Sequence, residues 1–166
     1  MTSVYDAAGN LLELNNTLNA TTRQTFLPSG QLVNKTLANG GQILYNYYDN
    51  GLLKSENDGN GNVTVYEYDE AGRISRVSQC GRITAFVYDT DGNLASVTNP
   101  AGETVSYLYN KQRKVTSCKD ACGNITAYEY DALGNCTKVT DALGNVTQYE
   151  YNAAGKVTAV IRCGRN

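Results

Sequence analysis

The sequence predicts an all-β fold: a meander of consecutive antiparallel β-hairpins, with two strands in each repeat of about 21 residues. Three observations predict it. An aromatic residue recurs with this period, a glycine suited to a tight turn falls at about half the period, and the segments between turns alternate with period two. Eight copies fill the chain. The recurring aromatic residues are Tyr5, Phe26, Tyr47, Tyr68, Tyr88, Tyr109, Tyr130 and Tyr151.

Each repeat contains a strand that ends on the recurring aromatic residue. Residues 64–68 read Thr-Val-Tyr-Glu-Tyr and are rich in strand-forming residues. The residue two places before the aromatic residue shares its face of the strand. Same-face aromatic residues on neighbouring hairpins are expected to form a ladder, in which each neighbouring pair contributes about 0.2–1 kcal/mol. The ladder positions are Tyr45, Tyr66, Phe86, Tyr107, Tyr128 and Tyr149.

A tight turn, the first turn of the repeat, follows the recurring aromatic residue. An Asp at its first position can accept a backbone N–H, and a Gly at its fourth position can adopt positive φ, which predicts a hairpin turn with a Gly bulge. Three repeats depart from this pattern, with Leu27 or Tyr48 at the first position or Arg113 at the fourth. The repeat-defining residues are Tyr5, Asp6, Gly9, Tyr68, Asp69, Gly72, Tyr88, Asp89, Gly92, Tyr130, Asp131, Gly134, Tyr151 and Gly155.

The return strand carries apolar residues six and nine places after the aromatic residue, as at Ile74 and Val77. Two residues three apart lie on opposite faces of an ideal strand. Either both faces are therefore partly buried, or a bulge redirects one residue. Cys136 and Cys118 occupy these two slots in other repeats and are interpreted as small apolar fillers.

A second turn with the same chemistry closes each repeat. Its residues include Asp58, Gly61, Asn99, Gly102, Asp120, Gly123, Asp141 and Gly144. The last residues, 163–165, repeat the sequence Cys-Gly-Arg of residues 80–82. We therefore expect residues 1–166 to form a single array of about eight repeats that stops in mid-repeat.

The composition argues against several classes of function. The chain has no histidine, which removes the usual base for nucleophilic catalysis and the commonest metal ligand. Its 14 basic and 16 acidic residues are scattered, unlike those of a nucleic-acid-binding protein. We find no run of about 20 apolar residues and no signal peptide. Cys80, Cys122 and Cys163 share one turn position, too far apart for disulfides, and Asp-rich turns such as 89–93 lack the remaining ligands of a calcium loop. We expect no cofactor, metal or catalytic residue.

The motif Tyr-Asp-x-x-Gly-(Asn/Arg)-(Leu/Ile), with Gly-Asn-x-Thr-x-Tyr between copies as at residues 123–128, resembles the RHS or YD repeat. The resemblance covers essentially the whole chain. Such arrays occur in bacterial RHS polymorphic toxins, wall-associated proteins, the shell component of insecticidal toxin complexes, and teneurins. The resemblance implies a curved or spiralling strip of hairpins, part of a β-shell, often around a C-terminal toxin domain. The family's Asp-Pro self-cleavage segment has no counterpart, because the only prolines are Pro28 and Pro100.

The resemblance therefore implies a non-catalytic structural segment, in a parent protein that is secreted or at the cell surface. Its partners would be the rest of a larger array or an encapsulated toxin domain. Two alternatives stay open: a cell-surface or carbohydrate-binding module that uses exposed Tyr and Asn, and a scaffold that associates with itself through its end strands. Packed tyrosines would favour the shell, whereas a groove of exposed rings would favour glycan binding.

Overall fold

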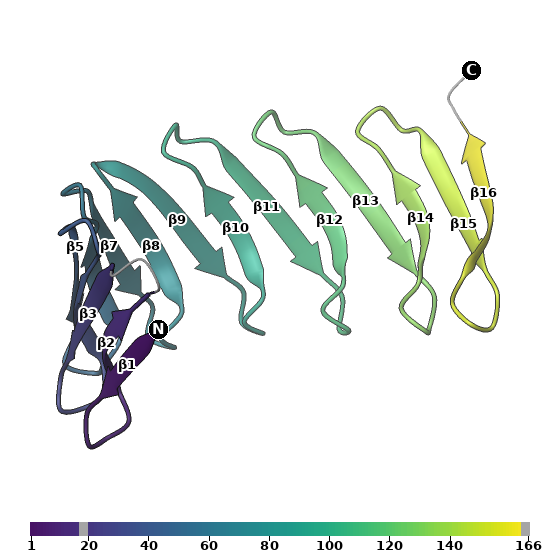
Figure 1. Cartoon of the computed structure of the whole chain (residues 1–166). Helices are drawn as coiled ribbons and strands as arrows, with labels where there is room; N and C mark the ends of the chain where they lie inside the picture. The colour runs from purple at the N-terminus through teal and green to yellow at the C-terminus, as the bar shows by residue number, and fades with distance from the viewer. Residues whose placement is uncertain (17–19, 164–166) are drawn as a thin grey trace. The chain divides into compact units, whose positions relative to one another are not determined.

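The computed structural model describes residues 1–16 and 20–163, and their regular structure consists of sixteen β-strands in sequence order. The all-β hairpin meander predicted from the sequence is confirmed (Figure 1). The chain divides into two compact units, residues 1–83 and 84–166. The strands of the first unit are β1 (Thr2–Tyr5), β2 (Leu11–Asn15), β3 (Thr21–Phe26), β4 (Leu32–Thr36), β5 (Gln42–Tyr47), β6 (Leu53–Asn57), β7 (Val63–Tyr68) and β8 (Ile74–Gln79).

The second unit repeats this arrangement, with each strand antiparallel to the next one along the chain. The strand β9 begins two residues before the second unit and continues into it. The strands are β9 (Arg82–Tyr88), β10 (Leu94–Thr98), β11 (Thr104–Tyr109), β12 (Val115–Lys119), β13 (Ile125–Tyr130), β14 (Cys136–Thr140), β15 (Val146–Tyr151) and β16 (Val157–Cys163).

The turns have the backbone that the sequence predicts. In the turn after Tyr68, the Asp69 N–H donates to the Arg73 carbonyl and the Gly72 N–H donates to the Asp69 carbonyl, both at 2.9 Å. Gly72 has φ of 76°, a conformation that most L-residues adopt only with strain. This combination is a type I turn followed by a Gly bulge, a common three-residue hairpin connection.

A β-bulge settles which faces the apolar residues of the return strand occupy. Tyr68 pairs with Ile74, and Glu67 pairs with Arg76, so Ser75 has no partner in the register. The register places Val77 opposite Tyr66. Because directly opposed residues share a face, the bulge brings Ile74 and Val77 to the face that carries the tyrosines. The same shift recurs in every hairpin that contains the first turn.

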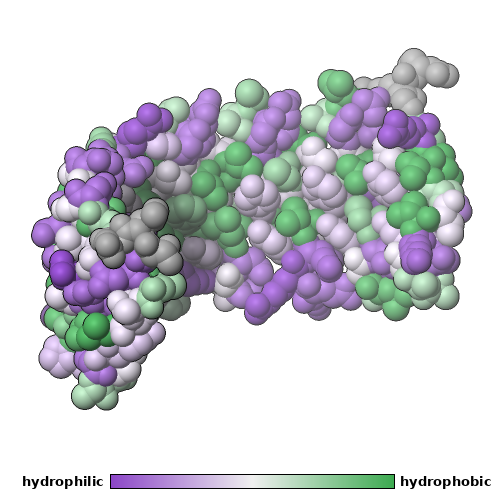
Figure 2. Space-filling model, in the orientation of Figure 1, coloured by the Kyte–Doolittle hydropathy of each residue, from purple (hydrophilic) through white to green (hydrophobic). Residues whose placement is uncertain are grey.

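Neither unit has a buried core among the residues that the structure describes. The accessible surface is 11205 Å², whereas a compact monomer of this length exposes about 8,000 Å². Figure 2 shows hydrophilic residues along the turn edges of the second unit, with hydrophobic and intermediate residues between them. Each unit is thus a single layer of strands, as Figure 1 shows.

The sequence predicts that the array stops in mid-repeat at its C-terminal end. The expected stop in mid-repeat depends on residues 164–166, which lie outside the described residues. A single array over the whole chain stays a prediction.

Within the described part of the chain, no helix is long and apolar enough to cross a membrane.

Candidate functional site

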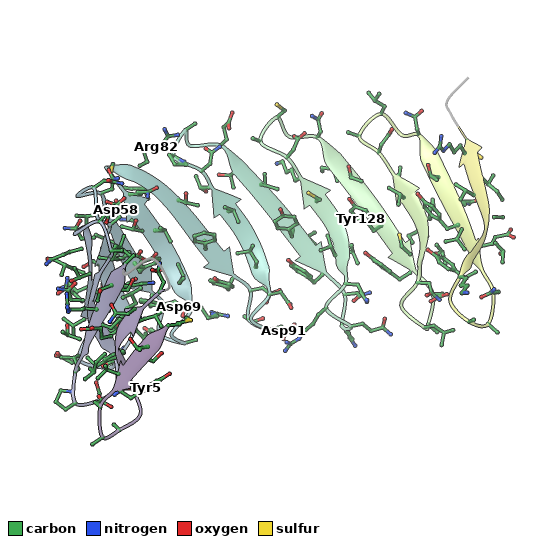
Figure 3. The ribbon with its side chains drawn as sticks, viewed as in Figure 1. Tyr5, Asp58, Asp69, Arg82, Asp91 and Tyr128 are labelled. Carbon is green, nitrogen blue, oxygen red and sulfur yellow. The ribbon has the colours of Figure 1, made fainter. Side chains whose placement is uncertain are left out.

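The first residue of most turns binds the turn backbone through its side chain. Asp58 Oδ1 accepts the N–H groups of Asn60 and Asn62 at 2.8 and 2.9 Å, and its Oδ2 accepts the Asn62 side-chain amide at 2.8 Å. These hydrogen bonds, the Asn62 amide first, lower the pKa of Asp58. Asp58 and Asp69 lie at the two turns that flank β7 (Figure 3). The same arrangement occurs at Asp6, Asp89, Asp120, Asp131 and Asp141.

Some turns lack the pairing of an Asp side chain with an Asn side chain, and these turns keep the same backbone contacts. Asp69 binds the Arg73 guanidinium at 2.7 Å, and the backbone N–H of Arg73 is the largest cause that lowers the pKa of Asp69. Asn99 replaces Asp and donates its side-chain amide to Glu103 at 2.7 Å. The turn carboxylates are therefore engaged in turn formation, where they accept backbone and side-chain donors.

The tyrosine of the first turn connects one repeat to the repeat before it. The hydroxyl of Tyr68 donates to the carbonyl oxygen of Leu53 at 2.9 Å. The register between β6 and β7 ends at Ser55 opposite Val65, so Leu53 lies where these strands have separated. The hydroxyl bridges this gap. The equivalent donors are Tyr47 to Leu32, Tyr109 to Leu94, Tyr130 to Val115 and Tyr151 to Cys136, at 2.7 to 2.9 Å.

The sequence reasoning missed these inter-repeat hydrogen bonds. The tyrosine and the residue whose carbonyl accepts its hydrogen bond are always 15 residues apart in the sequence. The accepting residue is the apolar residue that follows one recurring aromatic residue by six places, and the tyrosine is the recurring aromatic residue of the next repeat. A signal was available in the preference for Tyr over Phe at this position. Desolvation by burial raises the pKa of Tyr47, Tyr68, Tyr109, Tyr130 and Tyr151.

The predicted ladder residues lie on the tyrosine face with aliphatic or cysteine side chains opposite most of them. Tyr66 pairs with Val77, Phe86 and Tyr128 pair with valines, and Tyr107 pairs with Cys118. Between Tyr45 on β5 and Tyr66 on β7 lies the return strand β6. The tyrosine face therefore alternates aromatic strands with return strands, and an energetic ladder of rings stays a prediction. Figure 3 shows Tyr128 midway along its strand.

An edge-on ring contact involves Tyr48, the tyrosine outside the repeat consensus. Its ring centroid lies 6.2 Å from that of Tyr68 at an interplanar angle of 85°. The Tyr48 hydroxyl donates to the Tyr66 carbonyl at 3.0 Å, and Lys54 Nζ lies 5.6 Å from the Tyr48 ring centroid. Tyr48 thus fills the first position of its turn with a second inter-repeat contact in place of the usual Asp side chain.

The opposite face carries charged and exposed side chains. Glu129 binds Lys138 at 2.8 Å, and Glu67 lies 3.9 Å from Arg76 on the paired strand. Val87 and Leu108 occupy equivalent positions and are 56% and 66% exposed. This face is therefore solvent-exposed among the described residues.

The five cysteines are free thiols in this structure. Cys118 and Cys136 are half-buried on the tyrosine face, in the slots that other repeats fill with aliphatic residues, whereas Cys80, Cys122 and Cys163 are exposed. Across residues 1–16 and 20–163, no three His, Cys, Asp or Glu side chains form a cluster that could hold a metal ion. The contacts of these residues support a structural interpretation.

Shallow grooves occur where neighbouring hairpins separate at their turns. In the first unit, one of about 380 Å³ lies among Tyr48, Leu52, Glu67 and Asp69. In the second unit, one of about 620 Å³ lies between the turn at residues 110–112 and residues 128–132. Because these grooves follow the spacing of the hairpins, they repeat along the chain with different side chains.

Comparisons with known proteins agree with this architecture. The RHS Repeat family matches residues 47–79, 88–121, 115–146 and 130–162, more than half of the chain. A comparison with curated proteins gives no match.

Solved structures with a similar fold include three toxin complexes. A crystal structure of TcdB2-TccC3 without its hypervariable C-terminal region is 20% identical over 96% of this chain and 10% of that chain, with a TM-score of 0.74. The Photorhabdus luminescens Tc holotoxin pore is 17% identical over 99% of this chain and 12% of that chain, with a TM-score of 0.69. The crystal structure of TcdB2-TccC3-Cdc42 is 17% identical over 99% of this chain and 12% of that chain, with a TM-score of 0.70. The chain thus spans about a tenth of these chains, and identities this low show similarity of fold.

Proposed function

The chain belongs to the RHS-repeat family, and from this premise we propose that it helps to build a β-shell that encloses or presents a toxin or another C-terminal domain. In this role the segment is structural and non-catalytic. Its partners are the rest of a larger RHS array and the enclosed domain. The similarity to the Photorhabdus luminescens Tc holotoxin pore supports an extracellular role for the parent protein.

The observation that carries the proposal is a single layer of strands whose apolar face is left uncovered. None of the described residues is buried, although Tyr, Ile and Val gather on one face. A sheet with one apolar face gains stability when another layer covers that face or when the sheet closes on itself. A long wall of hairpins around an interior satisfies this requirement without a core inside the segment.

The contacts of the polar side chains support a non-catalytic role. Turn aspartates accept hydrogen bonds from their own turns, and six tyrosine hydroxyls donate to backbone carbonyls. These groups hold repeats together, which is the work of a scaffold. The half-buried rings also give less support to glycan binding through exposed tyrosines.

The test is protease protection in the longest natural protein that carries this segment. We expect a C-terminal domain that resists proteolysis until the shell is opened by Val97→Asp together with Val139→Asp on the tyrosine face. Leu108→Asp is the matched control because Leu108 lies on the opposite face and is 66% exposed. Equal digestion of the C-terminal domain in the intact protein and in isolation would refute enclosure.

Self-association through end strands is a second candidate, favoured by the last strand. β16 is seven residues long and pairs with β15 on one side. Val157, Val160 and Ile161 on it are 50%, 50% and 43% exposed. A long, apolar edge strand is a ready template for pairing with another chain.

A further inference from the structure

Two charged residues occupy slots of the tyrosine face that the other repeats fill with apolar residues. The residue nine places after the recurring aromatic residue is Lys35 in the second repeat and Glu56 in the third. In the other six repeats this residue is Leu14, Val77, Val97, Cys118, Val139 or Val160. Two adjacent repeats of the first unit therefore place charges of opposite sign where the repeat consensus is apolar.

The register places both charges on the same face as the tyrosines. Lys35 on β4 pairs with Ile43 on β5, and Glu56 on β6 pairs with Tyr45 on β5. Ile43 and Tyr45 alternate along one strand with Tyr47, so the three share a face. Directly opposed residues also share a face. Lys35 and Glu56 therefore stand on either side of Ile43 and Tyr45 on the tyrosine face.

Neither charge has a partner in the part of the chain that the structure describes. Among residues 1–16 and 20–163, Lys35 and Glu56 form no ion pair and no side-chain hydrogen bond. The strand β5 lies between them, and two strand spacings amount to about 9.5 Å. Both side chains are half-buried. Because a half-buried charge without a partner is costly, a partner from outside the chain would be favourable.

Charged residues on the opposite face of the first unit are arranged differently. Arg23 binds Glu13 at 3.0 Å, and Arg76 lies 3.9 Å from Glu67. Each of these pairs joins directly opposed residues of neighbouring strands. The opposite face thus pairs its charges within the chain, whereas the tyrosine face holds its two charges apart.

We propose that the tyrosine face of the first unit binds the same face of a second copy of this chain, with Lys35 of each copy against Glu56 of the other. A two-fold axis between the two faces forms this contact twice. Packed sheets lie about 10 Å apart, a distance that a lysine and a glutamate side chain span together. Ile43 and Tyr45 lie between the charges, at the centre of the contact. This pairing goes beyond the proposed structural role and does not depend on it.

The signs of the charges favour a second copy over another partner. One positive and one negative charge on either side of an apolar centre make a surface that is complementary to itself. A partner with charge of a single sign would oppose one of the two residues, and contacts between like charges are unfavourable. The equivalent slots of the second unit hold Val97, Cys118, Val139 and Val160, which offer no charge to either residue.

The uncovered surface is large enough for such a contact. The chain exposes about 3,000 Å² more than a compact monomer of its length. A standard protein interface buries about 800 Å² on each partner. Tyrosine is also among the residues that contribute most at the centre of an interface, which is the place of Tyr45 in the proposed dimer.

The test is sedimentation velocity of the 166-residue chain with Ile161→Lys, which places a charge on β16 and so opposes pairing through that edge. We expect a reversible dimer, weakened at least about tenfold by Lys35→Glu or by Glu56→Lys, because each change creates two like-charge contacts. Lys119→Glu makes the same change of charge on the opposite face. This matched control should alter dimerisation by less than about twofold.

A mixture of the two single variants tests the two-fold contact directly. The Lys35→Glu chain has a carboxylate at both positions, and the Glu56→Lys chain has an ammonium at both. A mixed dimer therefore has two contacts between opposite charges and should form at least about tenfold more tightly than either variant pairs with itself. A mixture of Lys119→Glu with Glu150→Lys has the same net charges and should show no such gain. A first mixture that sediments as the average of its components would overturn the proposal.

A second measurement separates the charge contact from folding. Lys35→Gln together with Glu56→Gln removes both charges, and its circular dichroism spectrum should match that of the parent chain. Added salt should weaken the dimer of the parent chain but not that of the Gln variant, because salt screens charge pairs. Equal salt dependence of the two would overturn the proposal. So would an Ile161→Lys chain that stays monomeric at every concentration, since this places all association at β16.

Discussion

Single tyrosine hydroxyls hold neighbouring repeats together at the edge where the strands separate. Each donates to a carbonyl on the preceding return strand, beyond the last registered pair between the two strands. Without that donor, the carbonyl would depend on water. Phe26 occupies the same slot without a hydroxyl, so the connection between its repeat and the first lacks this hydrogen bond.

Removal of one such hydroxyl should weaken the chain by the net value of one hydrogen bond. We expect Tyr130→Phe to lower the free energy of unfolding by about 0.5–1.5 kcal/mol, measured by urea denaturation. Phe26→Tyr should raise it by a similar amount, because residue 26 stands 15 residues after Leu11 as Tyr130 does after Val115. Tyr5→Phe is the control, because Tyr5 is 59% exposed, and a loss there as large as that of Tyr130→Phe would contradict the role of the hydroxyl.

The free-energy cost of a side chain at the positive-φ position of a turn should be measurable in a matched pair of variants. Gly102 has φ of 83°, and a Cβ built there meets nothing within 4 Å. Gly102→Ala therefore tests the backbone alone and should destabilise the chain by about 1–2 kcal/mol. Arg113→Gly should stabilise it by a somewhat smaller amount, since glycine also loses more entropy on folding. Thermal unfolding of both variants is the measurement, and a neutral Gly102→Ala would contradict the argument.

At the scale of the hairpin, two turns and one bulge set the register. The bulge after each first turn brings the two apolar residues of the return strand opposite the two aromatic residues of the outgoing strand. A hairpin without the bulge would turn one of them to the charged face. The spacing of six and nine residues is therefore as much a part of the repeat as the turn glycines.

The turn aspartates make the hairpins sensitive to acid. Hydrogen bonds from Asn124, its side chain first, lower the pKa of Asp120 below the ordinary value of 3.8. A carboxyl whose pKa is depressed in the folded state contributes stability above its unfolded pKa and loses it as the pH falls through the folded pKa. We expect the melting temperature to fall as the pH drops below about 4, as the seven turn aspartates with a lowered pKa become protonated.

Asp120→Asn is the variant that isolates this effect. Asn at the first position still accepts two backbone N–H groups, as Asn110 and Asn152 do, but it does not titrate. The variant should therefore show a smaller loss of melting temperature between pH 7 and pH 3, followed by circular dichroism. An unchanged pH dependence in the variant would contradict a role for the Asp120 carboxylate.

The sequence predicted the parts of the hairpin that depend on local chemistry. Asp69 and Gly72 act in their turn as expected, and Cys118 lies in a valine slot. The sequence left the bulge at Ser75 as one of two alternatives, because the spacing of apolar residues does not show which residue leaves the register. The hydroxyl contacts were missed because they join residues of different repeats at an edge where no strand pairing occurs.

At the largest scale, the stability of the described residues comes mainly from contacts between successive strands. Among the described residues, strand contacts join neighbours in sequence, and no side chain is buried. In such an array, stability approximates a sum of repeat terms and nearest-neighbour terms. A second copy of the chain or the rest of a larger array can then cover the apolar face and pair with the end strands.

The chain by itself should therefore associate as its concentration rises. Light scattering should show an average mass above 18.0 kDa at high concentration, because β16 offers a long apolar edge. Ile161→Lys places a charge on this strand and should shift association to higher concentration, whereas Leu143→Lys, at a turn residue that is 75% exposed, should not. A monomeric mass over a wide concentration range would contradict self-association. Equal association of both variants would indicate that the chains contact each other through the tyrosine face and not through the end strand.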